Sequence, residues 1–215
     1  MNTTKIENLL ENAKKAFQEN NLKEALDNIN QALTIEKNDP EIYFLRGTVN
    51  YNLEDFDSAT KDFEKAVEIN PNDADSYFNL GMIKFELNKI EEAITLFDKA
   101  IELDSFAEDV YFLRANAKSL IDDLEGALAD YNKAIEIEDS DEEFYYNRGL
   151  IYFELNKMEE AKEDFSKTIE LDPEFAEAYY SRAIVFEEEG DDASAAKDYK
   201  KAKEINPDIE NDMEE

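Results

Sequence analysis

The chain has 215 residues, of which 55 are Asp or Glu and 23 are Lys or Arg; its formal charge is −32, and it contains no His, Cys or Trp. The absence of His and Cys excludes an imidazole base, a thiolate nucleophile, a zinc site with His or Cys ligands, and any disulfide. A field this negative repels phosphate backbones, which makes nucleic acid a poor candidate partner, while 42% apolar content with 14 Phe and 11 Tyr favours a folded protein over a disordered one.

The chain begins with a short polar leader, residues 1–5, that runs directly into helical sequence. The leader lacks the apolar stretch of about 7 to 15 residues that a secretory signal needs. No run approaches the roughly 18 apolar residues of a membrane span. Together with the lack of cysteine, these features predict a cytoplasmic protein that does not contact membranes.

From residue 6 onward the sequence repeats itself every 34 residues without gaps. Repeat position 20 is Ala in all six units, and positions 8 and 27 carry small residues, which indicates that backbones lie close together there. Positions 4 and 24 carry bulky residues that fill the space beside the small ones. The six units are 6–39, 40–73, 74–107, 108–141, 142–175 and 176–209.

Each unit is predicted to form a helical hairpin. Apolar residues recur at helical spacing, as at Ala59, Phe63 and Ala66, and a polar pair such as Asn88-Lys89 separates an earlier helix from a later one. Proline at repeat position 32 is expected to stop the second helix, because it has no N–H to donate. Three units carry it: Pro71, Pro173 and Pro207.

This pattern resembles the tetratricopeptide repeat family over residues 6–209, and segments 178–183 and 134–137 are similar to that family's signature. The resemblance implies an all-α fold: an α-solenoid, coiled as a right-handed superhelix of six helix-turn-helix repeats, whose first helices line a concave groove. The chain departs from the family by lacking Trp at position 4. It also lacks proline at position 32 in three units, which carry Lys37, Ser105 and Asp139.

The last unit differs from the others where a seventh unit would follow. Glu187 and Asp192 stand at positions that are mostly apolar in the earlier units. We therefore expect unit six to be its own polar cap, followed by a disordered acidic tail at residues 210–215. Four lysines add to its polar character: Lys197, Lys200, Lys201 and Lys203.

In the family, positions 2, 5, 9, 12 and 13 of the first helix look into the groove, and here positions 5 and 12 are mostly aromatic. Two interpretations stay open: the rings pack between hairpins, or they contact a partner through ring edges and tyrosine hydroxyls. The candidates are Phe44, Phe78, Phe112, Tyr146 and Tyr180 at position 5, and Tyr51, Phe85 and Phe153 at position 12.

Position 2 is acidic in all six units. A carboxylate in the first turn stabilises the helix dipole by about 0.3 to 1 kcal/mol, which is a structural explanation for these acids. Whatever the reason for each acid, the groove is expected to be negative, and a basic or amphipathic protein segment is the complementary partner. The acidic candidates are Asp75, Asp109 and Glu143, and the amide candidates are Asn79, Asn116 and Asn147.

Two binding modes of the family fit this chain poorly. A carboxylate clamp needs Lys at position 5, where this chain has only Leu, Phe or Tyr. The asparagine ladder of the sugar-transferase relatives needs Asn at position 6 in successive units. Only Asn79 and Asn147 stand there, so a ladder is at most partial.

Two charged features have both a functional and a structural interpretation. Arginines at position 7 suggest an anion site, but a set of inter-helix ion pairs explains them more simply. The acidic run 138–143 could hold Ca²⁺, but it lacks the ligand order of an EF-hand and is better explained as a solvated loop. The arginines are Arg46, Arg114, Arg148 and Arg182.

The sequence thus predicts a monomeric, non-enzymatic interaction scaffold or adaptor with no cofactor or metal. Units four and five carry net charges of −7 and −6, the most negative of the six, so a basic partner is expected to approach residues 108–175 first. The alternative is an assembly factor that acts as a spacer or self-associates through Leu9, Leu10 and Phe17 of the first unit. An enzyme using paired carboxylates or an RNA-binding repeat protein fits the sequence less well.

Overall fold

The computed structural model describes residues 2–103 and 108–209, and helix is the only regular secondary structure in these ranges. The expected acidic tail at 210–215 lies outside the described residues, as does Ser105. The first helices of the repeats are α1 (Asn2–Gln18), α3 (Pro40–Asn52), α5 (Ala74–Glu86), α7 (Glu108–Ser119), α9 (Glu142–Glu154) and α11 (Ala176–Glu188). The second helices are α2 (Leu22–Ile35), α4 (Phe56–Ile69), α6 (Ile90–Leu103), α8 (Leu124–Ile137), α10 (Met158–Leu171) and α12 (Asp192–Ile205).

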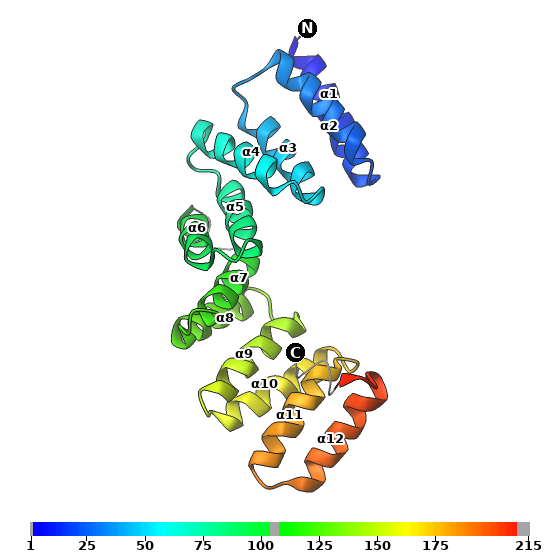
Figure 1. The fold of residues 1–215 in the computed structure, drawn as a ribbon, viewed down its shortest axis with the longest axis vertical. Helices are drawn as coiled ribbons and strands as arrows, with labels where there is room; N and C mark the ends of the chain where they lie inside the picture. Colours follow the sequence, from blue (N-terminus) through cyan, green and yellow to red (C-terminus); the bar gives the residue numbers. More distant parts are fainter. Residues whose placement is uncertain (1, 104–107, 210–215) are drawn as a thin grey trace. The chain divides into compact units, whose positions relative to one another are not determined.

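Each first helix packs against the second helix of its own repeat, so the predicted hairpins are confirmed (Figure 1). The chain divides into two compact units, residues 1–105 and 106–215. In the first unit α2 packs against α3 and α4 against α5; in the second, α8 packs against α9 and α10 against α11. The fold is therefore all-α, a solenoid of six helix-turn-helix repeats.

The interior of a hairpin joins a small residue of the first helix to a ring of the second. Gly81 at repeat position 8 faces Phe97 at position 24, and a Cβ added to Gly81 would lie 2.6 Å from a ring carbon. Two other repeats share this pairing: Gly47 with Phe63, and Gly149 with Phe165. Where position 8 is Ala, position 24 is Ile or Tyr, so the two positions change together to keep the interior close-packed.

The turn within each hairpin contains a left-handed residue at repeat position 15. Their φ angles lie between 56° and 78°. Five of them are Asn, Asp or Gly, which adopt this conformation at low cost, whereas Glu54 adopts it at φ 59° without that advantage. The six residues are Asn20, Glu54, Asn88, Asp122, Asn156 and Gly190.

The second helices end at repeat position 30 whether or not proline follows. α4 ends two residues before Pro71, and α2 ends two residues before Lys37. The expectation that proline sets this end was therefore wrong. In the two repeats without proline whose loops the structure describes, a tyrosine holds the loop: Tyr43 Oη donates to the carbonyl of Lys37 at 3.1 Å, and Tyr145 Oη donates to that of Asp139 at 3.3 Å.

Among the described residues, the large apolar side chains that are exposed lie in repeats 2 to 4, and none lies in the first or the last repeat. Leu9 and Leu10 are each only 9% exposed and belong to a core shared by α1, α2 and α3, and Phe17 packs against the same core. These three residues therefore serve the first hairpin and do not form an open apolar surface for self-association. In the last repeat, Glu187 and Asp192 are exposed, as expected for a polar cap.

Candidate functional site

The surface considered for partner binding is the first-helix face, defined as repeat positions 2, 5, 9, 12 and 13. At position 5, each aromatic ring packs on the ring at position 24 of its own repeat, with centroids 5.2 to 6.0 Å apart. The rings at position 5 are half-buried, so they hold the hairpin together and keep part of their surface accessible. The pairs are Phe44–Phe63, Phe78–Phe97, Phe112–Tyr131, Tyr146–Phe165 and Tyr180–Tyr199.

In residues 108–209, two of these rings also contact a second ring: Phe112 contacts the first helix of the following repeat, and Tyr146 contacts Phe175, the residue of its own repeat that directly precedes α11. The Phe112 ring lies 4.8 Å from that of Phe144, and the Tyr146 ring lies 4.9 Å from that of Phe175. Tyr146 Oη is 3.4 Å from Ser181 Oγ, and burial raises the pKa of Tyr146 above its ordinary value. Packing between helices and hairpins is therefore a definite role of the position 5 rings.

At position 12 the aromatic residues are half-buried as well. The Tyr51 ring lies 5.6 Å from that of Phe56. The pKa of Tyr51 is raised by burial and, to a lesser extent, by the carboxylate of Glu86. An acid of repeat 3 therefore lies near an aromatic residue of repeat 2. Phe153 packs against the core formed by α10 and α11, and Phe85 is half-buried on α5.

The acidic candidates lie in the first turns of their helices: Asp75 on α5, Asp109 on α7 and Glu143 on α9. All three are exposed. The pKa of Asp109 is raised above its ordinary value by partial burial and then by the carboxylates of Glu108 and Asp141. Negative charge is therefore crowded where α7 and α9 begin.

The first repeat differs from this arrangement. Because α1 begins at Asn2, Glu7 lies beyond the first turn, and the helix-dipole explanation for this acid was wrong. Glu41 at position 2 of repeat 2 accepts a hydrogen bond from Lys14 Nζ at 2.6 Å. A hollow of about 780 Å³ lies here, with Glu7, Leu10, Lys14 and Glu41 among its lining residues. The first-helix face thus carries charges of both signs in repeat 1.

The amide candidates bond within their own hairpins. Asn79 Nδ2 donates to the carbonyl of Asp75 at 2.7 Å, and Asn147 Nδ2 donates to that of Glu143 at 2.8 Å. Asn116 Oδ1 accepts from Tyr131 Oη at 2.6 Å. A partner that uses these amides must share or replace these bonds.

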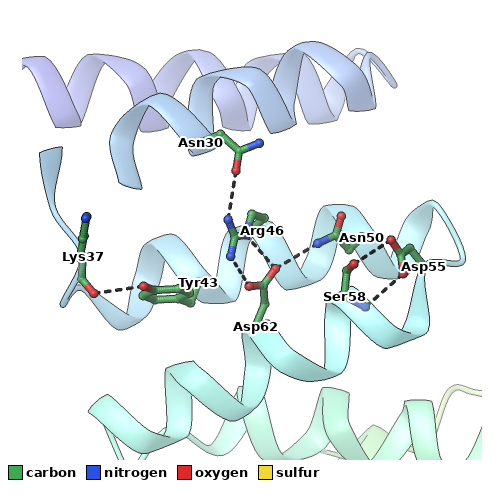
Figure 2. Close-up of polar contacts among 8 residues, drawn as sticks. All are labelled: Asn30, Lys37, Tyr43, Arg46, Asn50, Asp55, Ser58 and Asp62. Carbon is green, nitrogen blue, oxygen red and sulfur yellow. Dashed lines mark hydrogen bonds and ion pairs between the residues drawn. The ribbon is translucent and has the colours of Figure 1, made fainter. Parts of the chain in front are cut away.

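The arginines at repeat position 7 bond to aspartates at position 23, so the predicted inter-helix ion pairs are confirmed. Figure 2 shows Arg46 of α3 between Asp62 of α4 and Asn30 of α2. Arg46 Nε and Nη2 donate to the two oxygens of Asp62 at 2.9 and 2.6 Å, and Nη1 donates to Asn30 Oδ1 at 3.0 Å. The same bidentate pairing joins Arg114 to Asp130, Arg148 to Asp164, and Arg182 to Asp198.

The aspartates that pair with the arginines were not predicted from the sequence. They are nearly buried: Asp62, Asp130, Asp164 and Asp198. The signal was present, because position 23 is Asp in the same four repeats in which position 7 is Arg. In repeat 3 both positions are Leu, and in repeat 1 both are Asn. Arg46, Arg148 and Arg182 also bond to the residue at position 25 of the preceding repeat, so these guanidinium groups link neighbouring repeats.

The acidic run 138–143 makes local loop contacts. Glu138 Oε1 accepts from the backbone N–H and the hydroxyl of Ser140, at 3.0 and 2.6 Å. Asp141 caps α9 by accepting from the N–H of Glu143 at 2.9 Å. These bonds use the acids as loop and cap residues, and no His, Cys, Asp or Glu group in the described part of the chain is arranged to hold a metal ion.

Models of the tetratricopeptide repeat match most of the chain, at residues 40–73 and 142–175, 63–95, 122–156 and 176–209. The chain belongs to the tetratricopeptide repeat (TPR) family. This confirms the resemblance found in the sequence. Membership supports a general role as a scaffold for protein–protein interaction.

Solved structures with the same fold include the MamA protein, which is 28% identical over 79% of this chain and 92% of that chain, with a TM-score of 0.73. YrrB is 22% identical over 84% of this chain and 93% of that chain, with a TM-score of 0.76. PilF of Pseudomonas aeruginosa is 14% identical over 96% of this chain and 94% of that chain, with a TM-score of 0.82. The last two likenesses concern the fold alone.

The comparison with curated proteins gives no match. None of the helices in the described residues is both long enough and apolar enough to cross a bilayer.

Proposed function

We propose that this TPR protein is an adaptor whose first-helix face forms a groove for a basic, amphipathic segment of a partner protein, bound in extended or helical form. One observation carries the proposal: carboxylates and half-buried aromatic rings share this face in consecutive repeats. In residues 108–209 the carboxylates are Asp109, Glu143 and Glu177, and the rings are Phe112, Tyr146 and Tyr180.

Charge supports a basic partner. The pKa of Asp109 is raised first by partial burial and then by the carboxylates of Glu108 and Asp141, so acidic groups lie close together at the start of α7 and α9. Repeats four and five also carry the largest negative net charges, −7 and −6. Lys or Arg side chains of a partner relieve this repulsion and are steered toward it over roughly 8 Å at physiological salt.

Accessible aromatic surface supports an amphipathic partner. Rings fixed by packing lose little conformational entropy on binding, and Tyr is enriched among residues that contribute most to interfaces. Tyr146 and Tyr180 offer a hydroxyl as well as a ring. A similar fold is found in YrrB, whose structure is described as a TPR protein with an unusual peptide-binding site.

Variants in which acids are replaced by neutral amides of similar size test the proposal without disturbing the packed rings. The variant Asp109→Asn/Glu143→Gln/Glu177→Gln removes the position 2 acids of α7, α9 and α11. Its affinity for a fluorescein-labelled peptide of Lys and Leu at helical spacing is measured by anisotropy at physiological salt. We expect binding about tenfold weaker than for the unmodified protein, and a smaller dependence on salt.

The chain offers a matched control. The variant Glu125→Gln/Glu160→Gln/Asp192→Asn removes three acids from the first turns of α8, α10 and α12, with the same change in net charge and the same loss of helix-dipole contacts. We expect its affinity to stay within about twofold of the unmodified protein. If both variants weaken binding equally, net charge and not the first-helix face attracts the peptide, and the proposal is wrong.

A further inference from the structure

The last helix, α12, differs from the other second helices in charge. It carries four lysines and three acids, whereas every other second helix has more acids than bases. The excess of lysines is unusual in a chain of net charge −32. A polar cap does not explain it, because acidic residues would make the last helix equally polar. We use the name lysine face for Lys197, Lys200 and Lys201 of α12.

The lysine face is held less tightly than the equivalent lysines of other repeats. At repeat position 26, a lysine pairs with the glutamate three residues later in four repeats, at 2.5 to 2.9 Å: Lys65–Glu68, Lys99–Glu102, Lys133–Glu136 and Lys167–Glu170. In α12, Lys201 Nζ is instead 3.5 Å from Glu174, and Lys200 Nζ is 3.6 Å from Glu204. Such long, exposed ion pairs contribute little and are readily exchanged for another carboxylate.

Repeat position 25 also changes character in the last repeat. Asn30, Asn132 and Ser166 at this position accept hydrogen bonds from the arginine of the following repeat. Lys200 occupies the same position, and an ammonium group can only donate. It therefore cannot receive the arginine of a further repeat, but it can bind a carboxylate.

A hollow of about 450 Å³ lies beside the lysine face, and its lining includes Ile169 of α10 and Tyr179 and Arg182 of α11. Arg182 is fixed by Asp198, at 2.7 Å from Nε, and by Ser166. The loop before Tyr179 contains Pro173. Tyr43 and Tyr145 donate to a carbonyl of the preceding loop, whereas no such bond is found for the Tyr179 hydroxyl among the described residues. The hollow thus combines a phenol hydroxyl and an apolar wall with more cations than acids, because its two carboxylates, Asp198 and Glu204, are outnumbered by Arg182 and the three lysines.

We propose that the lysine face binds an acidic protein segment, whose carboxylates contact Lys197, Lys200 and Lys201 while an apolar side chain enters the hollow beside Ile169 and Tyr179. A peptide fits better than nucleic acid, because a long phosphate backbone would extend from this small patch over a strongly negative surface. This site is separate from the first-helix face and has the opposite charge. Together the two faces allow the adaptor to bridge a basic and an acidic partner.

The test uses the full chain and a labelled peptide of Glu and Leu at helical spacing, measured by anisotropy at physiological salt. The variant Lys197→Gln/Lys200→Gln/Lys201→Gln is expected to bind this peptide about tenfold more weakly than the unmodified protein. The control, Lys65→Gln/Lys99→Gln/Lys133→Gln, changes the net charge equally at the tightly paired lysines of repeats 2 to 4 and is expected to bind within about twofold. Circular dichroism verifies that both variants stay folded.

Three outcomes overturn the proposal: no binding of the Glu and Leu peptide by the unmodified protein, equal loss in both variants, or tighter binding of single-stranded RNA or of anionic phosphatidylserine vesicles than of the peptide. Failure here is distinguishable from failure of the proposed groove. The Lys and Leu peptide reports on the first-helix face and is expected to bind the lysine-face variant at least as well as the unmodified protein.

Discussion

Repeat 5 places Arg148 and Asp164 between its helices at the two positions where repeat 3 places Leu80 and Leu96. In repeat 5 the guanidinium donates to both carboxylate oxygens, at 2.8 and 2.7 Å, and reaches the preceding repeat through a bond of 2.6 Å to Asn132. In repeat 3, Leu80 is 4% exposed and belongs to an apolar core against which Leu96 packs.

The difference separates two contributions to repeat stacking. A buried ion pair contributes little net stability, because desolvation offsets most of the attraction. Its hydrogen bonds nevertheless require a fixed geometry, and they link one repeat to the next. A leucine pair stabilises by burial and imposes no such direction. The same backbone accommodates both pairs, so each pair can be changed one residue at a time.

The largest effect is expected from removing one partner of the ion pair. In Asp164→Ala, the Arg148 guanidinium stays mostly enclosed without its carboxylate, and we expect a loss of about 3–5 kcal/mol in the free energy of unfolding. Equilibrium urea denaturation measures this loss. A cost below about 1 kcal/mol would mean that Arg148 simply turns to solvent.

A second prediction concerns a feature that repeats 3 and 5 share. The Cβ of Gly81→Ala would lie 2.6 Å from a Phe97 ring carbon, and that of Gly149→Ala would lie 2.8 Å from a Phe165 ring carbon. Each substitution is expected to lower the free energy of unfolding by about 1–3 kcal/mol through overpacking. Thermal and urea denaturation check this. Clearly unequal costs would show that the two repeats differ beyond positions 7 and 23.

Repeats 3 and 5 also agree at the turn, where both have Asn at the left-handed position and repeat 2 has Glu54. Replacing Glu54 by Asn is expected to stabilise the protein by about 1 kcal/mol, because Asn adopts positive φ more readily. The melting temperature should rise. As a matched comparison, Asn88→Glu should lower it by a similar amount, and a neutral result in both would show that the turn is not strained.

Converting repeat 5 to the pattern of repeat 3 is expected to have a smaller effect than removing Asp164 alone. The double variant Arg148→Leu/Asp164→Leu removes both charges together, so neither stays buried without a partner. We expect its unfolding free energy to lie within about 1 kcal/mol of the unmodified protein or above it. Urea denaturation of the double variant beside Asp164→Ala tests this. A double variant as unstable as the single one would show that the ion pair itself is required.

The smallest effect is expected where charge is crowded instead of paired. The raised pKa of Asp109 means that the folded protein holds this proton more tightly than the unfolded chain. The resulting stability is fully present below the ordinary value of 3.8 and is lost as pH rises through the raised pKa. Asp109→Asn should therefore be slightly more stable at neutral pH, by at most about 0.5 kcal/mol, and the gain should vanish in acid. Denaturation at both pH values checks the sign.

Much of the fold followed from the sequence, because six aligned units reveal positions that one unit would hide. Small and bulky residues alternate in register, and this predicted the hairpins correctly. The ends of the second helices were explained wrongly, because proline is only one way to hold the loop and Tyr43 is another. The start of α1 was placed too late, which misassigned Glu7.

The candidate site was harder to predict. The sequence indicated ion pairs for the arginines but offered many carboxylates, and choosing Asp164 for Arg148 requires reading positions 7 and 23 together. Similarly, the ring of Phe112 stands on the expected face, but its contacts with Tyr131 and Phe144 depend on how two neighbouring helices pack against it. The repeat period predicts which face of a helix a residue occupies. The exposed fraction of its side chain depends on how the neighbouring helices pack against it.

Binding of a basic, amphipathic segment to the first-helix face can be mapped residue by residue. The most direct test is an NMR titration of the labelled full chain with the Lys and Leu peptide, following backbone and side-chain signals. We expect the largest shifts on α7, α9 and α11, at residues such as Asp109, Phe112 and Tyr146. Shifts concentrated on α8, α10 and α12, or spread evenly over the acidic surface, would contradict it.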